Sequence, residues 1–122
     1  MSRKILLIED NEGDQFLIKE LFDEFYNDWE FSAVVSGEEG IKKVELDKPD
    51  IVITDTQLPG MDGFETCKRI KDLNGDSVKV VVMTGLFDSV NAIKAREMGA
   101  DDYCVKTSNM AEIARVLKAM IG

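Results

Sequence analysis

The sequence predicts an α/β fold, a doubly wound parallel sheet of five strands in a single domain that spans residues 1–122. Short, almost continuously aliphatic runs recur along the chain, and such runs suit strands that are covered on both faces. Segments in which apolar residues have helical spacing lie between these runs. Regular alternation of strands and helices builds a parallel sheet with right-handed crossovers and helices on both faces.

The expected strands differ in strength. Three of them, at residues 5–8, 51–53 and 78–83, are aliphatic almost throughout, and Lys79 is the one interruption. A weaker strand is expected at residues 31–35 and a short one at residues 103–105. The size of the chain favours the five-stranded order 2-1-3-4-5 among the common doubly wound orders, which makes the expected fold flavodoxin-like.

One helix is expected after each strand. The apolar faces are, in chain order, Phe16, Leu17, Leu21 and Phe25; Ile41 and Val44; Phe64, Cys67, Ile70 and Leu73; Val90, Ile93 and Met98; and Met110, Ile113, Ala114, Leu117, Met120 and Ile121. Asp14 and Gln15 lie near the start of the first helix. Helix breakers follow three of the others: Lys48–Pro49, Asn74–Gly75, and Gly99 as a left-handed cap.

Composition excludes several classes of function. The formal net charge is −9, from 24 acidic and 15 basic residues, which argues against direct binding to nucleic acid or to an anionic membrane. The chain has no histidine, so it holds neither a Ser-His-Asp triad nor an imidazole metal ligand. Cys67 and Cys104 lie far apart and are expected to be buried, reduced thiols. No run is apolar over the roughly 18 residues that cross a bilayer, and the start is too short for a signal peptide, so we expect a soluble cytoplasmic protein.

Polar groups collect where ligands of open α/β sheets bind, at the carboxyl ends of the strands beside the reversal of strand order. The groups are Glu9 and Asp10, Asp55, Thr84, and Lys106. The first and third strands should be neighbours, so the three carboxylates should converge in one crevice. Two like charges about 4 Å apart repel by roughly 4 kcal/mol at an effective dielectric of about 20, which favours a bound cation. Oxygen ligands without histidine or cysteine suit Mg²⁺ best.

These groups are the parts that phosphoryl transfer to a carboxylate needs. Asp55 can act as the nucleophile, while Glu9 and Asp10 hold the metal ion that neutralises phosphoryl oxygens. Lys106 supplies a fixed cation and Thr84 a hydroxyl donor. Each residue alone has an ordinary structural explanation, but together they fall at one edge of one predicted sheet.

Four motifs, at residues 8–11 (IEDN), 53–63 (ITDTQLPGMDG), 83–85 (MTG) and 99–106 (GADDYCVK), resemble those of response-regulator receiver domains of two-component signalling. The resemblance covers essentially the whole chain. It implies that Asp55 is phosphorylated by a histidine kinase or a phosphotransfer protein. It also implies that Asp10, Asp55 and the backbone carbonyl of Gln57 ligate Mg²⁺, with Glu9 acting through water, and that Thr84 and Tyr103 form the switch pair.

The resemblance extends to residues around the site. Gln57 and Leu86 match positions that tune the lifetime of the phosphoryl group, and an apolar Leu86 is expected to shield it from water. The output, a contact with a downstream protein target, is expected at the face of the fourth helix, the fifth strand and the fifth helix, around Lys94, Tyr103 and Lys118. One departure is Thr107, which stands where the family usually has a proline that favours a cis peptide bond.

Three functions fit the residues to different degrees. The favoured one is a phosphorylation switch that assists only its own phosphorylation and dephosphorylation and is otherwise not an enzyme. A pseudo-receiver, a constitutive interaction module, would lack a key carboxylate or the lysine, and none is missing here. A phosphohydrolase of small molecules would need an insertion for substrate selection. Asp62–Gly63 is interpreted as a structural turn before a helix.

Overall fold

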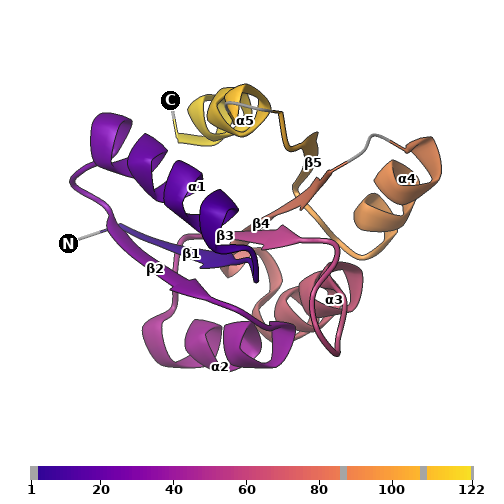
Figure 1. Ribbon diagram of the computed structural model, residues 1–122. Coiled ribbons are helices and arrows are strands. Elements are labelled where there is room, and N and C mark those ends of the chain that lie inside the picture. The colour runs from indigo at the N-terminus through magenta and orange to yellow at the C-terminus, as the bar shows by residue number, and fades with distance from the viewer. Residues whose placement is uncertain (1–2, 86–87, 108–109, 122) are drawn as a thin grey trace.

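The computed structural model describes residues 3–85, 88–107 and 110–121, in which strands and helices alternate as expected (Figure 1). The elements are β1 (Lys4–Ile8), α1 (Glu12–Phe25), β2 (Glu30–Val34), α2 (Gly37–Asp47), β3 (Ile51–Asp55), α3 (Gly63–Asn74), the short 3-10 helix η1 (Gly75–Ser77), β4 (Lys79–Thr84), α4 (Ser89–Glu97), β5 (Asp102–Val105) and α5 (Ala111–Ile121). Every expected strand and helix is present, and the strand bounds differ from the expected ones by one or two residues.

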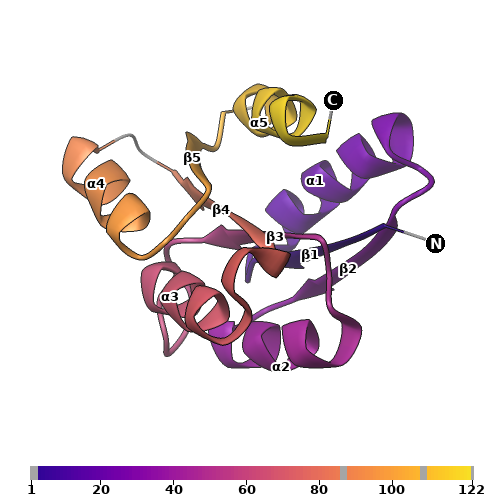
Figure 2. The same ribbon diagram turned by 180° about the vertical axis from the view of Figure 1, so that it is seen from behind.

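The five strands form one parallel sheet in the order β2-β1-β3-β4-β5, which confirms the predicted flavodoxin-like topology. Helices α1 and α5 cover one face of the sheet, and α2, α3 and α4 lie on the other side (Figures 1 and 2). Because strand order reverses between β1 and β3, their carboxyl ends form the edge at which a ligand site is expected.

The core has two halves because successive strand residues point to opposite faces of the sheet. In β1, Ile5 and Leu7 pack with α1 and α5, whereas Leu6 and Ile8 pack with α2, α3 and α4. Cys67 and Cys104 are buried and free, as the sequence indicated, and burial raises the pKa of each thiol to about 12. Within the described ranges, no helix is long and apolar enough to cross a membrane.

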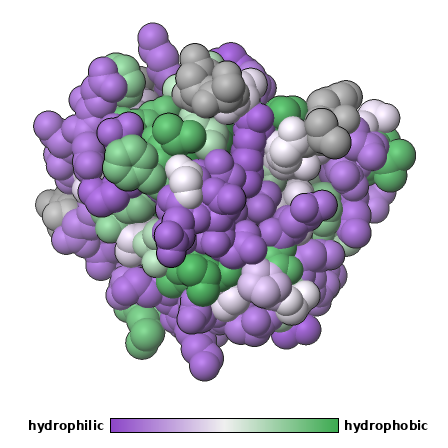
Figure 3. All heavy atoms as spheres, in the orientation of Figure 1, coloured by the Kyte–Doolittle hydropathy of each residue, from purple (hydrophilic) through white to green (hydrophobic). Residues whose placement is uncertain are grey.

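The predicted apolar face of α1 is wrong except at Leu21, which packs in part against the core. Ile18 and Phe22 are the buried residues of this helix, while Phe16 and Phe25 are 60% and 65% exposed. Apolar residues occupy adjacent positions along α1, so helical spacing fits more than one stripe and does not fix the rotation of the helix. On the face that Figure 3 draws, green hydrophobic patches interrupt a largely hydrophilic surface.

The predicted face of α4 is also wrong. Val90 and Ile93 are exposed, and Ala95 is the one buried residue of Ser89–Glu97, with Met98 packed in part against the core. On α3, Leu73 is exposed although the three preceding residues of its stripe are buried. Helical periodicity alone does not reveal which apolar side chains the rest of the fold leaves exposed.

The start of α3 is fixed beside the carboxyl end of β3. Asp62 caps the helix, since its side chain accepts a hydrogen bond from the Glu65 amide at 2.9 Å, in agreement with the structural interpretation of this turn. Gly63 donates its amide to the Thr56 carbonyl at 3.0 Å. A Cβ atom at Gly63 would lie 1.8 Å from the Asp55 carbonyl oxygen, so only glycine allows this approach.

We therefore expect Gly63→Ala to destabilise the protein by about 1–3 kcal/mol, because the helix must move away from β3 to admit a methyl group. Urea unfolding would measure the change. Gly85→Ala is the matched control, since a Cβ there meets no atom within 4 Å. Equal stability of Gly63→Ala and the wild type would show that the contact is looser than described.

Candidate functional site

The carboxyl ends of four strands bring the predicted groups together. Glu9 and Asp10 follow β1, Asp55 ends β3, Thr84 ends β4 and Lys106 follows β5. The main chain fixes the last of these directly, because the Lys106 amide donates to the Thr84 carbonyl at 2.7 Å. Residues far apart in sequence are therefore placed by the register of the parallel strands.

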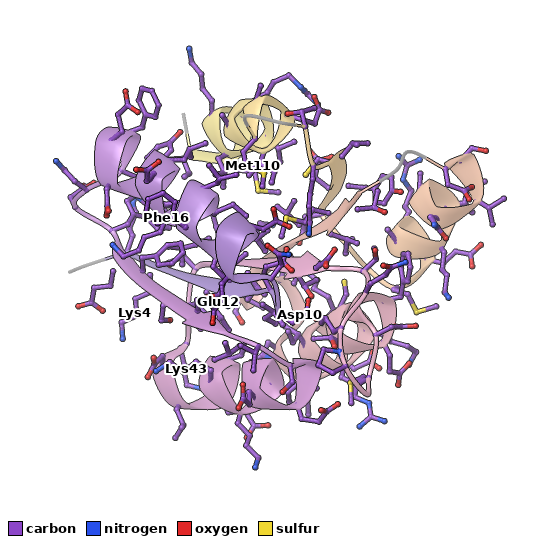
Figure 4. The ribbon with its side chains drawn as sticks, in the orientation of Figure 1. Lys4, Asp10, Glu12, Phe16, Lys43 and Met110 are labelled. Carbon is purple, nitrogen blue, oxygen red and sulfur yellow. The ribbon has the colours of Figure 1, made fainter. Side chains whose placement is uncertain are left out.

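Glu9, Asp10 and Asp55 form an acidic cluster in which one carboxylate oxygen from each residue lies within 4.8 Å of the others. Glu9 is fully buried and Asp55 is 6% exposed, whereas Asp10 is exposed, on the segment between β1 and α1 (Figure 4). The cluster is thus closed on the side of the core and open toward solvent. Its donor set is made only of oxygen atoms, which suits a hard divalent cation.

Lys106 is held by three carboxylates. Its Nζ lies 2.5 Å from Glu9 Oε1, 2.8 Å from Asp14 Oδ2 and 3.3 Å from Asp55 Oδ2, and its side chain is 14% exposed. Burial by itself lowers the pKa of Lys106, but the hydrogen bonds to Asp14 and Glu9 outweigh it, so the pKa is raised. Lys106 is therefore a fixed cation next to Asp55, as predicted.

Asp55 faces a pocket that opens to solvent. Its Oδ1 accepts a hydrogen bond from the Thr56 amide at 2.9 Å, which orients the carboxylate. The lining residues are Asp55, Thr56, Gln57, Thr84, Gly85, Asp88, Asn91 and Lys106. The predicted Gln57 and Thr84 are part of this wall. Thr56, Asp88 and Asn91 were not predicted, because short polar residues after strands and at helix starts look like ordinary turn residues.

Thr84 and Tyr103, the predicted switch pair, lie close together. The Thr84 hydroxyl is 3.5 Å from the Thr56 hydroxyl at the floor of the pocket. The Tyr103 ring packs in part against the core. Its hydroxyl is buried near the Thr84 side chain and the Asp88 backbone without a hydrogen bond of normal geometry, and burial raises its pKa. The pair thus connects the pocket, at the end of β4, with the edge strand β5.

The loop after Lys106 carries Thr107 where the family usually has proline. No cis peptide bond occurs within residues 3–85, 88–107 and 110–121. The Thr107 hydroxyl accepts a hydrogen bond from the Ala111 amide at 2.9 Å, and its carbonyl accepts one from Met110 at 3.0 Å. The Thr107 side chain therefore satisfies the amide of the first residue of α5 (Ala111–Ile121), and a proline side chain has no oxygen for this bond. The expected shielding residue, Leu86, lies outside the described residues.

Glu9 is under electrostatic strain. Burial raises its pKa from 4.5 to about 7, and the nearby Asp55 charge adds to the rise, while hydrogen bonds from Lys106 and the Asn11 amide oppose it. A buried carboxylate beside another one favours either a proton or a metal ion. The charge state of the buried Glu9 should therefore depend both on pH and on a metal ion bound in the cluster.

Comparisons with known proteins agree with the geometry. The sequence profile of the response regulator receiver domain matches residues 5–118. The transcriptional regulatory protein AfsQ1 of Streptomyces coelicolor is 38% identical over 90 residues, which are 74% of this chain and 37% of AfsQ1. The sporulation initiation phosphotransferase F of Bacillus subtilis is 29% identical over 118 residues, which are 97% of this chain and 93% of that protein.

A solved structure of a receiver domain is also similar to this chain. The BeF3-activated N-terminal receiver domain of Klebsiella pneumoniae RstA matches with a TM-score of 0.81 at 31% identity, over 96% of this chain and 97% of the other. The chain spans between 37% and 49% of the length of three transcriptional regulators that it resembles. The similarity to those proteins therefore concerns one part of each.

Glu9 should make the metal-free protein less stable as the pH rises. The unfolded carboxyl titrates near 4.5 and the folded one at about 7, so between these values the folded state binds more protons and loses stability with increasing pH. We expect the stability difference between wild type and Glu9→Gln to shift by about 1–2 kcal/mol against the wild type from pH 5.5 to 8. Urea unfolding with EDTA would measure it.

The comparison is clean because the chain has no histidine to titrate in this range. The amino terminus and the exposed carboxylates are common to both proteins and cancel in the difference. A difference that stays constant from pH 5.5 to 8 would contradict the raised pKa of Glu9.

Proposed function

The chain belongs to the response regulator receiver domain family, whose members serve phosphorylation-dependent signalling in two-component systems, and from that membership we propose that Asp55 accepts a phosphoryl group with Mg²⁺ bound beside it. The donor is a histidine kinase or a phosphotransfer protein. One observation carries the proposal: Asp55 is a buried carboxylate that belongs to an acidic cluster, lies 3.3 Å from the Lys106 ammonium group and lines an open pocket.

The acidic cluster would hold the metal ion. Asp10 and Asp55 offer carboxylate oxygens, Glu9 would act through water, and the backbone carbonyl of Gln57 would complete the protein ligands, as the family resemblance implies. Bound Mg²⁺ supplies positive charge that neutralises phosphoryl oxygens during transfer. A donor set without nitrogen or sulfur supports this choice, because Mg²⁺ prefers oxygen ligands.

The protein groups have complementary roles in the transfer. The Asp55 carboxylate attacks phosphorus, a bond to the acyl oxygen forms, and the bond to the leaving donor breaks with its electron pair staying on the donor. Thr56 holds one Asp55 oxygen through its amide at 2.9 Å, which keeps the carboxylate oriented. Lys106 offsets negative charge on the phosphoryl oxygens, and the Thr84 hydroxyl donates a hydrogen bond to one of them. The protein thereby assists only its own phosphorylation and dephosphorylation.

The signal would leave through the surface of α4, β5 and α5. Phosphate favours one of two pre-existing arrangements of Thr84 and Tyr103, and the population shift changes the surface around Lys94, Tyr103 and Lys118. The exposed Val90 and Ile93 of α4 support this assignment, since they offer apolar contacts to a partner. The Lys94 ammonium lies 4.6 Å from the centre of the Phe64 ring, which ties this surface to α3.

Incubation with acetyl phosphate, with and without Mg²⁺, tests phosphorylation directly. We expect intact mass spectrometry to show a single phosphoryl adduct that requires Mg²⁺ and is absent in Asp55→Asn, because the amide is no nucleophile toward phosphorus. Asp23→Asn, an exposed site on α1, is the matched control and should be modified like the wild type. A wild-type protein that stays unmodified would instead indicate a pseudo-receiver.

A further inference from the structure

Asp14 lies at the site but belongs to none of its motifs. It is in the first turn of α1, and its Oδ2 is 2.8 Å from Lys106 Nζ, closer than Asp55 at 3.3 Å. It is not a member of the acidic cluster of Glu9, Asp10 and Asp55. We propose that Asp14 is a positioning residue that holds the Lys106 ammonium on the α1 side of the site and competes with the phosphoryl group for it. This inference rests on the proposed function.

The pairing follows from how α1 is packed. Asp14, Ile18 and Phe22 are spaced four residues apart, so they share one face of the helix, and the last two are buried in the core. The Asn11 side chain caps the helix by accepting a hydrogen bond from the Asp14 amide at 2.9 Å. The backbone of Asp14 is therefore fixed, and its carboxylate is directed toward the sheet rather than into solvent.

The Lys106–Asp14 pair is less exposed to solvent than Lys19–Asp23, a surface ion pair of the same helix. In the Lys19–Asp23 pair both side chains are more than half exposed, at 55% and 63%. In the Lys106–Asp14 pair they are 14% and 28% exposed. Charges that are partly removed from water interact more strongly, because solvent and salt screen them less.

An ammonium group has three hydrogen atoms to donate, and here three carboxylates surround it. Glu9 and Asp14 are the two nearest, so most of the Lys106 charge is offset before a phosphoryl group arrives. A phosphoryl group on Asp55 needs a donor from the same ammonium group and is repelled by the Asp14 charge. Asp14 should therefore oppose binding of an anion at Asp55 while it keeps the ammonium in place.

Asp14→Asn removes the charge and keeps the size of the side chain. We expect it to bind beryllofluoride, a phosphoryl mimic, about three- to tenfold more tightly than the wild type at saturating Mg²⁺. NMR titration of the backbone amides measures this affinity. Asp14→Glu keeps a carboxylate and should restore an affinity near that of the wild type. Asp23→Asn makes the same change of net charge on the same helix and should leave the affinity unchanged.

The expected sign separates positioning from a structural role, because damage to the fold cannot tighten binding. Equal or weaker binding by Asp14→Asn, with a wild type that binds, would overturn the inference and leave the proposed function intact. A wild type that fails to bind beryllofluoride with Mg²⁺ would count against the proposed function itself. If Asp23→Asn tightened binding as much as Asp14→Asn does, the effect would come from net charge alone, and the inference would also be overturned.

Discussion

The site depends on one electrostatic constraint, the pairing of a half-buried lysine with carboxylates from distant parts of the sequence. Lys106 bonds to Glu9 and Asp14 across sequence separations of 97 and 92 residues. Charges removed from water are costly unless they are paired. The parallel register of β1, β3 and β5 supplies that pairing, since it sets the ends of these strands at one edge. Topology and charge balance are therefore two aspects of the same arrangement.

The sheet also separates stability from function along each strand: the strand interiors stabilise the protein, and the carboxyl ends form the candidate site. The aliphatic interiors of β1, β3 and β4 bury their side chains in two core clusters. At the carboxyl ends of β1 and β3, Glu9 is buried beside the Asp55 carboxylate, and Gly63 at the start of α3 lies against the Asp55 carbonyl. Such local conflicts persist only where the surrounding structure is strong enough to hold them, and they mark functional sites.

Sequence reasoning predicted the topology and the convergence of Glu9, Asp10, Asp55 and Lys106 at one edge of the sheet, because both follow from strand order. It failed at the buried faces of α1 and α4, and the error at α1 also affected the site. The stripe expected to be buried, with Leu17 and Leu21, is offset by one position from the observed Ile18 and Phe22. The observed stripe also contains Asp14, so the wrong face hid the third partner of Lys106. A helix with apolar residues on adjacent stripes takes its rotation from tertiary packing, which the sequence does not display.

The weak anchoring of α4 gives the proposed switch a physical route. Asp88 lines the pocket beside Asp55 and also caps α4, since its side chain accepts a hydrogen bond from the Val90 amide at 2.8 Å. Of Ser89–Glu97, Ala95 alone is buried, so a shift of this helix would disturb little apolar packing. A phosphoryl group on Asp55 would thus be able to shift α4, because the first turn of this helix borders the site. The exposed side of α4 carries the apolar Val90 and Ile93. A rigid, well-buried α4 would not transmit a change at the pocket to the surface of α4, β5 and α5.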